Sequence, residues 1–161
     1  MKKKLYIIAH NIRSAHNVGS VFRTADGAGV DRIYLTGYTQ APFDEKKSAY
    51  PAQAQKMLAK TALGAEEAVS WERVENIGDL ILGLRKDGVQ IVALENGMPS
   101  VDYRKFKPSF PCALILGTEV TGIDEEVLGE CDSVISIPMR GQKESLNVSV
   151  AAGIAMYEIL K

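Results

Sequence analysis

Short apolar runs alternate with amphipathic stretches along the whole chain. The apolar runs have the length and composition of buried strands, and they lie at 5–9, 32–36, 68–74, 89–94, 112–116 and 134–137. Apolar residues at helical spacing predict helices at 14–27, 52–62, 77–86, 124–129 and from 146 onward. Strands that alternate with helices in this way predict an α/β fold, with a mainly parallel sheet flanked by helices.

Local start and stop signals support the predicted helix boundaries. Ser14, Asn76 and Ser145 each precede a predicted helix, where a side-chain oxygen can accept a hydrogen bond from a free N–H group of the first turn. Gly27 and Gly29 are expected to end the first helix, because glycine tolerates the left-handed conformation that closes many helices.

The last predicted helix differs from the others because it is apolar nearly all round. Such a helix is buried inside a domain or against a partner subunit. Asn147 and Ser149 nevertheless lie in its first turn, beside free N–H groups and the positive end of the helix dipole. The polar loop that leads into this helix is therefore expected to form the wall of a pocket.

Size and composition predict one domain, residues 1–161, in which 46% of the residues are hydrophobic and 24% charged. The polar, turn-rich residues 38–50 predict a long functional loop. Cys112 and Cys131 lack the spacing of metal ligands, so a metal site is not expected and a reducing compartment fits. No run is long enough for a signal peptide or a membrane span, which predicts a cytoplasmic protein with no membrane contact.

Charge is unevenly distributed along the chain. Residues 1–60 contain ten Lys or Arg and four Asp or Glu, whereas the rest contains nine and 16, so the two parts carry +6 and −7 within a total of −1. This asymmetry is compatible with a basic face for nucleic acid, and an accident of composition is the alternative.

Polar clusters follow the first, fifth and sixth predicted strands, at the edge where open α/β sheets bind ligands. In the first cluster, Arg13, Asn17 and Arg23 on one helix suit a phosphate or a ribose; a solvated helix face is the alternative. In the second, Gly117 and Gly122 would let backbone amides approach a ligand, yet the segment matches neither a P-loop nor a dinucleotide fingerprint.

The third cluster holds Arg140 and Lys143, which suit either a polyanion or an ordinary exposed loop. Neither histidine, His10 or His16, has an elbow serine or a paired cysteine beside it in the sequence, so classical nucleophilic catalysis is not indicated.

Taken together, the segments 17–25, 116–122 and 137–149 resemble the three ordered motifs of the SpoU/TrmH family, the RNA ribose 2′-O-methyltransferases of the SPOUT superfamily. Residues 60–66 also resemble a segment common in that family. The resemblance spans nearly the whole chain. It implies a C-terminal deep trefoil knot that holds S-adenosylmethionine, and an obligate homodimer whose site draws on both subunits.

The family resemblance also assigns roles to individual residues. Its catalytic set corresponds to Arg23, Asn17, Glu119, Ser145 and Asn147. Its cofactor-binding set corresponds to Leu94, Leu116, Gly117, Gly122, Ile137, Met139, Gly141 and Leu146. RNA contacts are expected at Arg13, Arg140 and Lys143.

The implied substrate is a ribose 2′-OH in RNA, with tRNA favoured over rRNA. Without a separate RNA-binding domain, recognition would rest on the basic N-terminal part and the loop 38–50. Since a guanidinium with a pKa above about 12 is a poor base, Arg23 is expected to bind a phosphate and stabilise the developing alkoxide. The alternatives are a base-directed RNA methyltransferase, a non-catalytic RNA-binding or assembly factor that keeps the fold, and a generic nucleotide-binding α/β protein.

Overall fold

The computed structural model describes residues 2–161. Its strands are β1 (Leu5–His10), β2 (Arg32–Thr36), β3 (Trp71–Val74), β4 (Gln90–Leu94), β5 (Val101–Asp102), β6 (Cys112–Leu116) and β7 (Ser133–Ser136). Its helices are α1 (Ala15–Ala28), α2 (Gln53–Ala62), α3 (Ala65–Ala68), α4 (Ile77–Lys86), α5 (Glu125–Gly129) and α6 (Val148–Leu160). No helix formed by these residues is long and apolar enough to cross a lipid bilayer.

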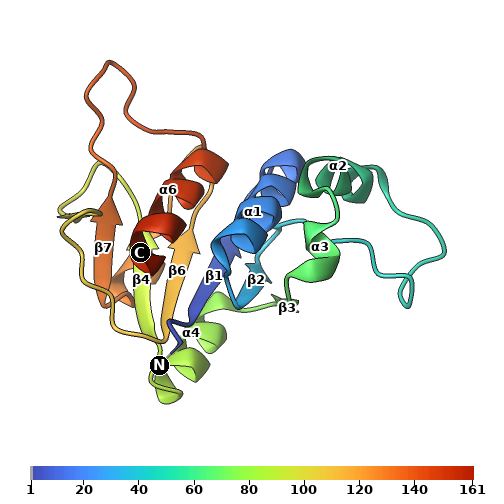
Figure 1. Ribbon diagram of the computed structural model, residues 1–161, viewed down its shortest axis with the longest axis horizontal. Helices are drawn as coiled ribbons and strands as arrows, with labels where there is room; N and C mark the ends of the chain where they lie inside the picture. The colour runs from blue at the N-terminus through green and yellow to red at the C-terminus, as the bar shows by residue number, and fades with distance from the viewer. Residues whose placement is uncertain (1) are drawn as a thin grey trace.

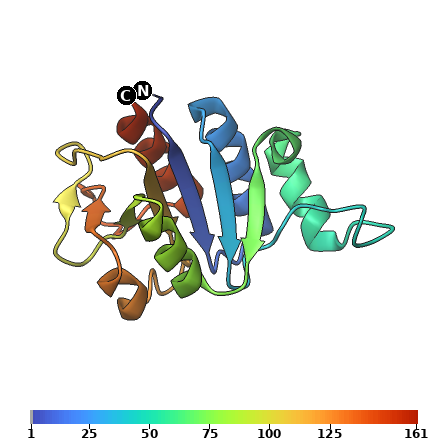
Figure 2. The same cartoon turned by 90° about the horizontal axis from the view of Figure 1, so that it is seen from below.

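The strands form one sheet in the order β3-β2-β1-β6-β4-β7-β5, and every neighbouring pair is parallel. Helices α1, α2, α3 and α6 cover one face over a large apolar cluster, while α4 and α5 cover the other over a smaller one (Figures 1 and 2). Burial on both faces explains why the central strands β1, β6 and β4 read as continuous apolar runs. The predicted α/β class with a mainly parallel sheet is confirmed.

Two of the predicted helix caps are present. Ser14 accepts a hydrogen bond from the N–H of Asn17 at 3.1 Å, and Asn76 accepts one from the N–H of Asp79 at 3.1 Å. The end of α1 differs from the prediction because Gly27 lies inside the helix, and Gly29 alone closes it in the left-handed conformation.

Several details of the predicted elements were wrong, most of them by one residue at an end and three of them by more. Residues 65–68 form α3, so the strand predicted to begin at 68 begins at Trp71. The two-residue strand β5 was missed, because two residues are too few to show a pattern. The cap of α6 is Asn147 in place of Ser145, since the Asn147 side chain accepts from the N–H of Ser149 at 2.9 Å.

Helix α6 is buried on one side only. Its residues that pack into the core are Ala152, Ala155, Met156 and Ile159. Val150 and Tyr157 instead expose 52% and 57% of their surface. The prediction of an apolar helix against the core therefore holds for one face, and the other face is open within a single chain.

Strand β7 lies between β4 and β5 in the sheet, although β4 and β5 follow each other in the sequence and are joined by one short segment. Leu94 and Val101 both pair with Ile135, from opposite sides of β7. Residues 95–100 therefore pass from one side of β7 to the other, near its carboxyl end. The chain that leaves β7 for α6 passes this crossing segment (Figure 1).

Candidate active site

A cavity of about 280 Å³ opens at the carboxyl ends of β4, β6 and β7. The loops after these strands and the start of α6 line it with Leu94, Glu95, Asn96, Gly97, Leu116, Gly117, Thr118, Glu119, Val120, Thr121, Gly122, Ile137, Glu144, Ser145, Leu146, Val148 and Ala151. The volume lies near the lower end of the range of about 300–1,000 Å³ for small-molecule sites. The carboxyl edge of a parallel sheet is where such sites are expected.

Glu95 ties the loop after β4 to the loop after β6. Its carboxylate accepts hydrogen bonds from the N–H of Ile123 at 2.7 Å and from the N–H of Asn96 at 3.0 Å. A Cβ at Gly122 would lie 2.2 Å from a Glu95 carboxylate oxygen, and the φ of Gly122 is 73°. The positive φ therefore favours glycine at 122, and any Cβ there would have to displace the Glu95 carboxylate from its hydrogen bonds.

Asn96 ties the loop after β4 to the loop after β7. Its side chain accepts from the N–H of Ile137 at 3.2 Å and donates to the carbonyl of Ile137 at 3.1 Å. It also donates to the carbonyl of Glu144 at 3.3 Å. The sequence analysis missed both Glu95 and Asn96, because Glu-Asn-Gly after a strand is indistinguishable from an ordinary turn.

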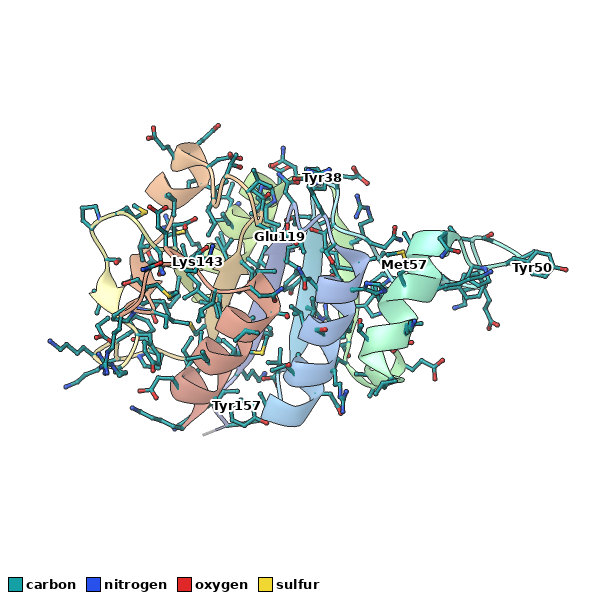
Figure 3. All side chains as sticks on the ribbon, turned by 90° about the horizontal axis from the view of Figure 1, so that it is seen from above. Tyr38, Tyr50, Met57, Glu119, Lys143 and Tyr157 are labelled. Atoms are coloured by element: carbon teal, nitrogen blue, oxygen red, sulfur yellow. The ribbon has the colours of Figure 1, made fainter. Side chains whose placement is uncertain are left out.

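A chain of hydrogen bonds at the lip of the cavity joins all three predicted motifs. Asn17 donates through Nδ2 to Glu119 at 3.2 Å and accepts through Oδ1 from Asn147 at 3.1 Å. The side-chain oxygen Oδ1 of Asn147 in turn accepts from the hydroxyl of Ser149 at 2.6 Å. Glu119 lies near the N-terminal end of α6, where these side chains meet (Figure 3).

The Glu119 carboxylate is held by groups from α1 and its cap. Besides Asn17, it accepts from the backbone N–H groups of Arg13 at 3.3 Å and Ser14 at 3.4 Å. Desolvation acts to raise the pKa of Glu119, but the backbone N–H of Glu119 itself and these hydrogen bonds outweigh desolvation and hold the pKa below its usual range. Glu119 is therefore an anion at neutral pH and acts as a fixed acceptor.

The predicted cofactor-binding residues are only partly brought together. Leu94, Leu116, Gly117, Gly122, Ile137 and Leu146 line the cavity. Met139 and Gly141 do not, and a Cβ on Gly141 would meet no atom within 4 Å. The proposed reason for Gly117 also changes. Its Cβ would lie 2.5 Å from Ile123, so glycine is needed there for the loop to fold back on itself.

The remaining predicted residues are at the surface. Ser145 lines the cavity and is exposed. Arg13, Arg140 and Lys143 are exposed, and Lys143 extends from the loop that precedes α6 (Figure 3). Among residues 2–161 no group of three or more His, Cys, Asp or Glu is arranged to hold a metal ion.

Arg23 lies apart from the cavity in the single chain. It is exposed and lines a second hollow, of about 610 Å³, with Lys60, Thr61 and Tyr157 among its neighbours. Tyr157 is at the far end of α6 from Glu119 (Figure 3). The structure therefore unites Asn17, Glu119 and Asn147, and it leaves the predicted central arginine outside this group.

The fold is that of an α/β protein with a cavity of small-ligand size where three loops meet at the carboxyl edge of its sheet. The SpoU rRNA Methylase family model matches residues 4–157. The chain belongs to this family, as its motifs predicted.

Similar proteins and structures agree with this assignment. The tRNA (guanosine(18)-2′-O)-methyltransferase of Escherichia coli K12 is 32% identical over 154 residues, covering 96% of this chain and 62% of its own length. That of Aquifex aeolicus is 33% identical, covering 98% and 69%. The AdoMet-bound rRNA methyltransferase from Sinorhizobium meliloti aligns with a TM-score of 0.86 and 32% identity, covering 99% of this chain and 56% of that one. The chain thus spans about three fifths of the length of several relatives.

Proposed function

We propose that this protein is an S-adenosylmethionine-dependent RNA methyltransferase that acts on a ribose 2′-OH. The observation that carries the proposal is the hydrogen-bonded chain Glu119–Asn17–Asn147, which joins the three family motifs at the lip of one cavity. Family membership and the names of the relatives, two of them tRNA 2′-O-methyltransferases, support the same chemistry.

The cavity suits this cofactor in its chemical composition. Leu94, Leu116, Ile137 and Leu146 supply apolar walls for the faces of an adenine, and the surrounding loops supply peptide groups for its polar edge. The anionic Glu119 at the lip is compatible with a nearby sulfonium. When bound, the cofactor supplies an electrophilic methyl group.

The protein's own residues would then orient the ribose and ease the loss of its proton. Glu119 can accept a hydrogen bond from a ribose hydroxyl; Asn17 holds Glu119 in place by a hydrogen bond, and Asn147 in turn holds Asn17. Arg23 would bind the adjoining phosphate and stabilise the negative charge that develops on the 2′ oxygen. The proton would pass to the phosphate or to water.

A homodimer would reconcile the position of Arg23 with this role. Arg23 is outside the cavity of its own chain, whereas α6 exposes Val150 and Tyr157 on the side that the core leaves open. An exposed apolar helix face beside α1 suits contact with a second copy. We propose that Arg23 of one copy serves the cavity of the other.

We also propose that the C-terminal segment forms the deep trefoil knot implied by the family resemblance. Two features support it: residues 95–100 cross β7, and Asn96 in that segment bonds Ile137 and Glu144 on the chain that follows. A knot would fix these loops around the cavity without any further element.

The first test of the function is methyl transfer from radiolabelled S-adenosylmethionine to purified tRNA and rRNA pools, with calorimetry of cofactor binding beside it. We expect label in RNA, with tRNA the better pool. If cofactor binds and neither pool accepts label, the protein is a non-catalytic binder and the proposed reaction is wrong.

A further inference from the structure

A third hollow lies beneath the loop that follows β2, at the edge of the sheet opposite to β5. Its volume is about 310 Å³. The loop supplies most of its wall, α2 supplies one residue and the edge strand β3 supplies two. The lining residues are Tyr38, Thr39, Gln40, Ala41, Pro42, Asp44, Lys47, Ser48, Gln55, Trp71 and Arg73.

A polar network holds the base of this loop in place. The Arg73 guanidinium donates to the carbonyl of Thr39 at 2.8 Å and to that of Gly37 at 2.5 Å. The Thr39 hydroxyl, which is buried, donates to the carbonyl of Ala9 and accepts from the N–H of Ile12. The wall nearest the sheet is therefore formed before any ligand arrives.

The free groups of the hollow match those of a nucleobase. Tyr38 and Trp71 supply aromatic rings, on which unstacked RNA bases commonly stack. Gln40 uses its NH₂ group on the carbonyl of Ala41, and Gln55 uses its carbonyl oxygen on the N–H of Ala52. Among residues 2–161 the other half of each amide has no partner, which leaves one acceptor and one donor for a base edge.

Charge and position also fit a nucleotide. Lys47 is an exposed cation on the rim, suited to a phosphate, and the Asp44 carboxylate is engaged by the N–H of Lys46 at 3.0 Å. Three strand steps separate β6, which leads to Glu119, from β3. At about 4.8 Å a step this is roughly 14 Å, a distance that a few nucleotides of one strand span.

We propose that this hollow binds an unpaired base of the RNA substrate, a few nucleotides from the ribose at the cavity, with the base against Tyr38 and Trp71. The inference rests on the proposed function for the identity of the ligand. It assigns the loop 38–50 a base-binding role beyond the general RNA contact expected from its sequence.

Trp71 is the single tryptophan of the chain and lines this hollow, so quenching of its fluorescence reports a ligand that binds there. The experiment titrates the whole protein with single-stranded RNA tetranucleotides, one for each base, and with inorganic phosphate as an anion control. We expect saturable quenching by at least one tetranucleotide and none by phosphate. No quenching, or equal quenching by phosphate, would overturn the inference.

Matched variants locate the binding. Tyr38→Ala should lower the affinity for the quenching tetranucleotide by about five- to a hundredfold, the usual effect of removing a stacking ring. Tyr50→Ala should have no effect, because Tyr50 is 81% exposed at the tip of the same loop and outside the hollow (Figure 3). In a second pair, Lys47→Ala should lower the affinity for the tetranucleotide, and Lys46→Ala, outside the hollow, should not. Equal losses within a pair would contradict the inference.

This test separates the inference from the proposed function, because tetranucleotide binding requires neither cofactor nor methyl transfer. Quenching without methylation of any RNA pool would refute the proposed reaction and retain the base site. Methylation of RNA without quenching at Trp71 would retain the reaction and refute the base site.

Discussion

The two halves of the carboxyl edge of the sheet are built on different principles. Over β4, β6 and β7 the loops are tied to one another, by the charged Glu95 and the amide of Asn96. Over β1 and β2 only the base of the loop is held, at the strand ends: Thr39 donates to the carbonyl of Ala9 and accepts from the N–H of Ile12, beside the buried pair His10 and Thr36.

The difference shows how one edge can serve two ligands. Loops that hold each other enclose a cavity, and any change in one loop is passed to the next. A loop that is anchored only at its base has a fixed start and a projecting tip, as residues 38–50 do in Figure 2. The first arrangement suits a small cofactor, and the second suits a long polymer that arrives from solvent.

Arg23 belongs to neither half within one chain, and its removal should have the largest effect. Arg23→Ala should lower kcat for methyl transfer about 10²- to 10³-fold, the usual result of removing a donor that stabilises developing charge. Calorimetric affinity for S-adenosylmethionine should be unchanged. Arg32→Ala is the control. Arg32 begins β2, at the amino end of the strand and away from the carboxyl edge that carries the cavity, so this variant should keep full activity.

Mixing variants tests whether the site joins two copies. Arg23→Ala and Glu119→Ala should each be inactive alone, yet their co-expressed mixture should regain about a quarter of the activity, since half of the dimers then hold one intact site of two. A mixture as inactive as its parents would place both residues in the same chain's site.

The ties between the loops are tested at Glu95. Glu95→Ala removes the acceptor of two backbone N–H groups and should weaken cofactor binding about ten- to a hundredfold, because hydrogen bonds to charged groups are worth about 1.5–3 kcal/mol. Glu144→Ala is the matched control: it also lines the cavity, but only its backbone is engaged. Equal affinities measured by calorimetry for the two variants would contradict this account.

Two glycines of the same half should behave differently. Gly122→Ala should lower the melting temperature by about 2–8 °C, since the left-handed backbone costs about 1–2 kcal/mol and the new Cβ collides with Glu95. A Cβ at Gly141 would meet no atom within 4 Å, so Gly141→Ala should leave the melting temperature unchanged. Calorimetric melting of both proteins checks this, and a similar drop in both would show that the loops adjust freely.

The smallest expected effect is a pH dependence from the other half. Burial lowers the pKa of His10, with Asp124 opposing the shift weakly, and its Nδ1 lies 2.8 Å from the Thr36 hydroxyl. As the pH falls, His10 is therefore protonated at a higher pH in the unfolded chain than in the folded protein. Stability present above the ordinary pKa of about 6.5 is lost as the pH falls toward the lower folded pKa.

Urea midpoints at pH 7.5 and 5.5 would measure this loss. His10→Asn should reduce the difference between the two midpoints, while His16→Asn, on the exposed face of α1, should not. An unaltered difference in the His10 variant would show that the shift comes from other groups.

Local patterns were sufficient to predict most of the fold. β2, β6 and α4 have the predicted bounds, because each has a clear apolar period and a nearby cap or glycine. Strand β5 and the crossing at residues 95–100 had no such signal. Two residues carry no period, and the order of strands in a sheet depends on contacts between distant segments.

The site could be predicted only where a motif named its residues. The family resemblance selected Asn17, Glu119 and Asn147, which the structure joins by hydrogen bonds. It did not indicate Glu95 or Asn96, whose partners are backbone groups 28 and 41 residues away along the chain. Backbone partners leave no mark on the sequence, so these two residues required coordinates.

The most direct test of the central claim is to label RNA with the methyl group and then hydrolyse it with alkali. Alkaline cleavage requires a free 2′-OH beside the phosphate, so a 2′-O-methyl group protects its own linkage. We predict that the label remains in alkali-resistant dinucleotides and that Arg23→Ala abolishes it. Label found only in mononucleotides would mean that a base is methylated, and the proposed ribose chemistry would be wrong.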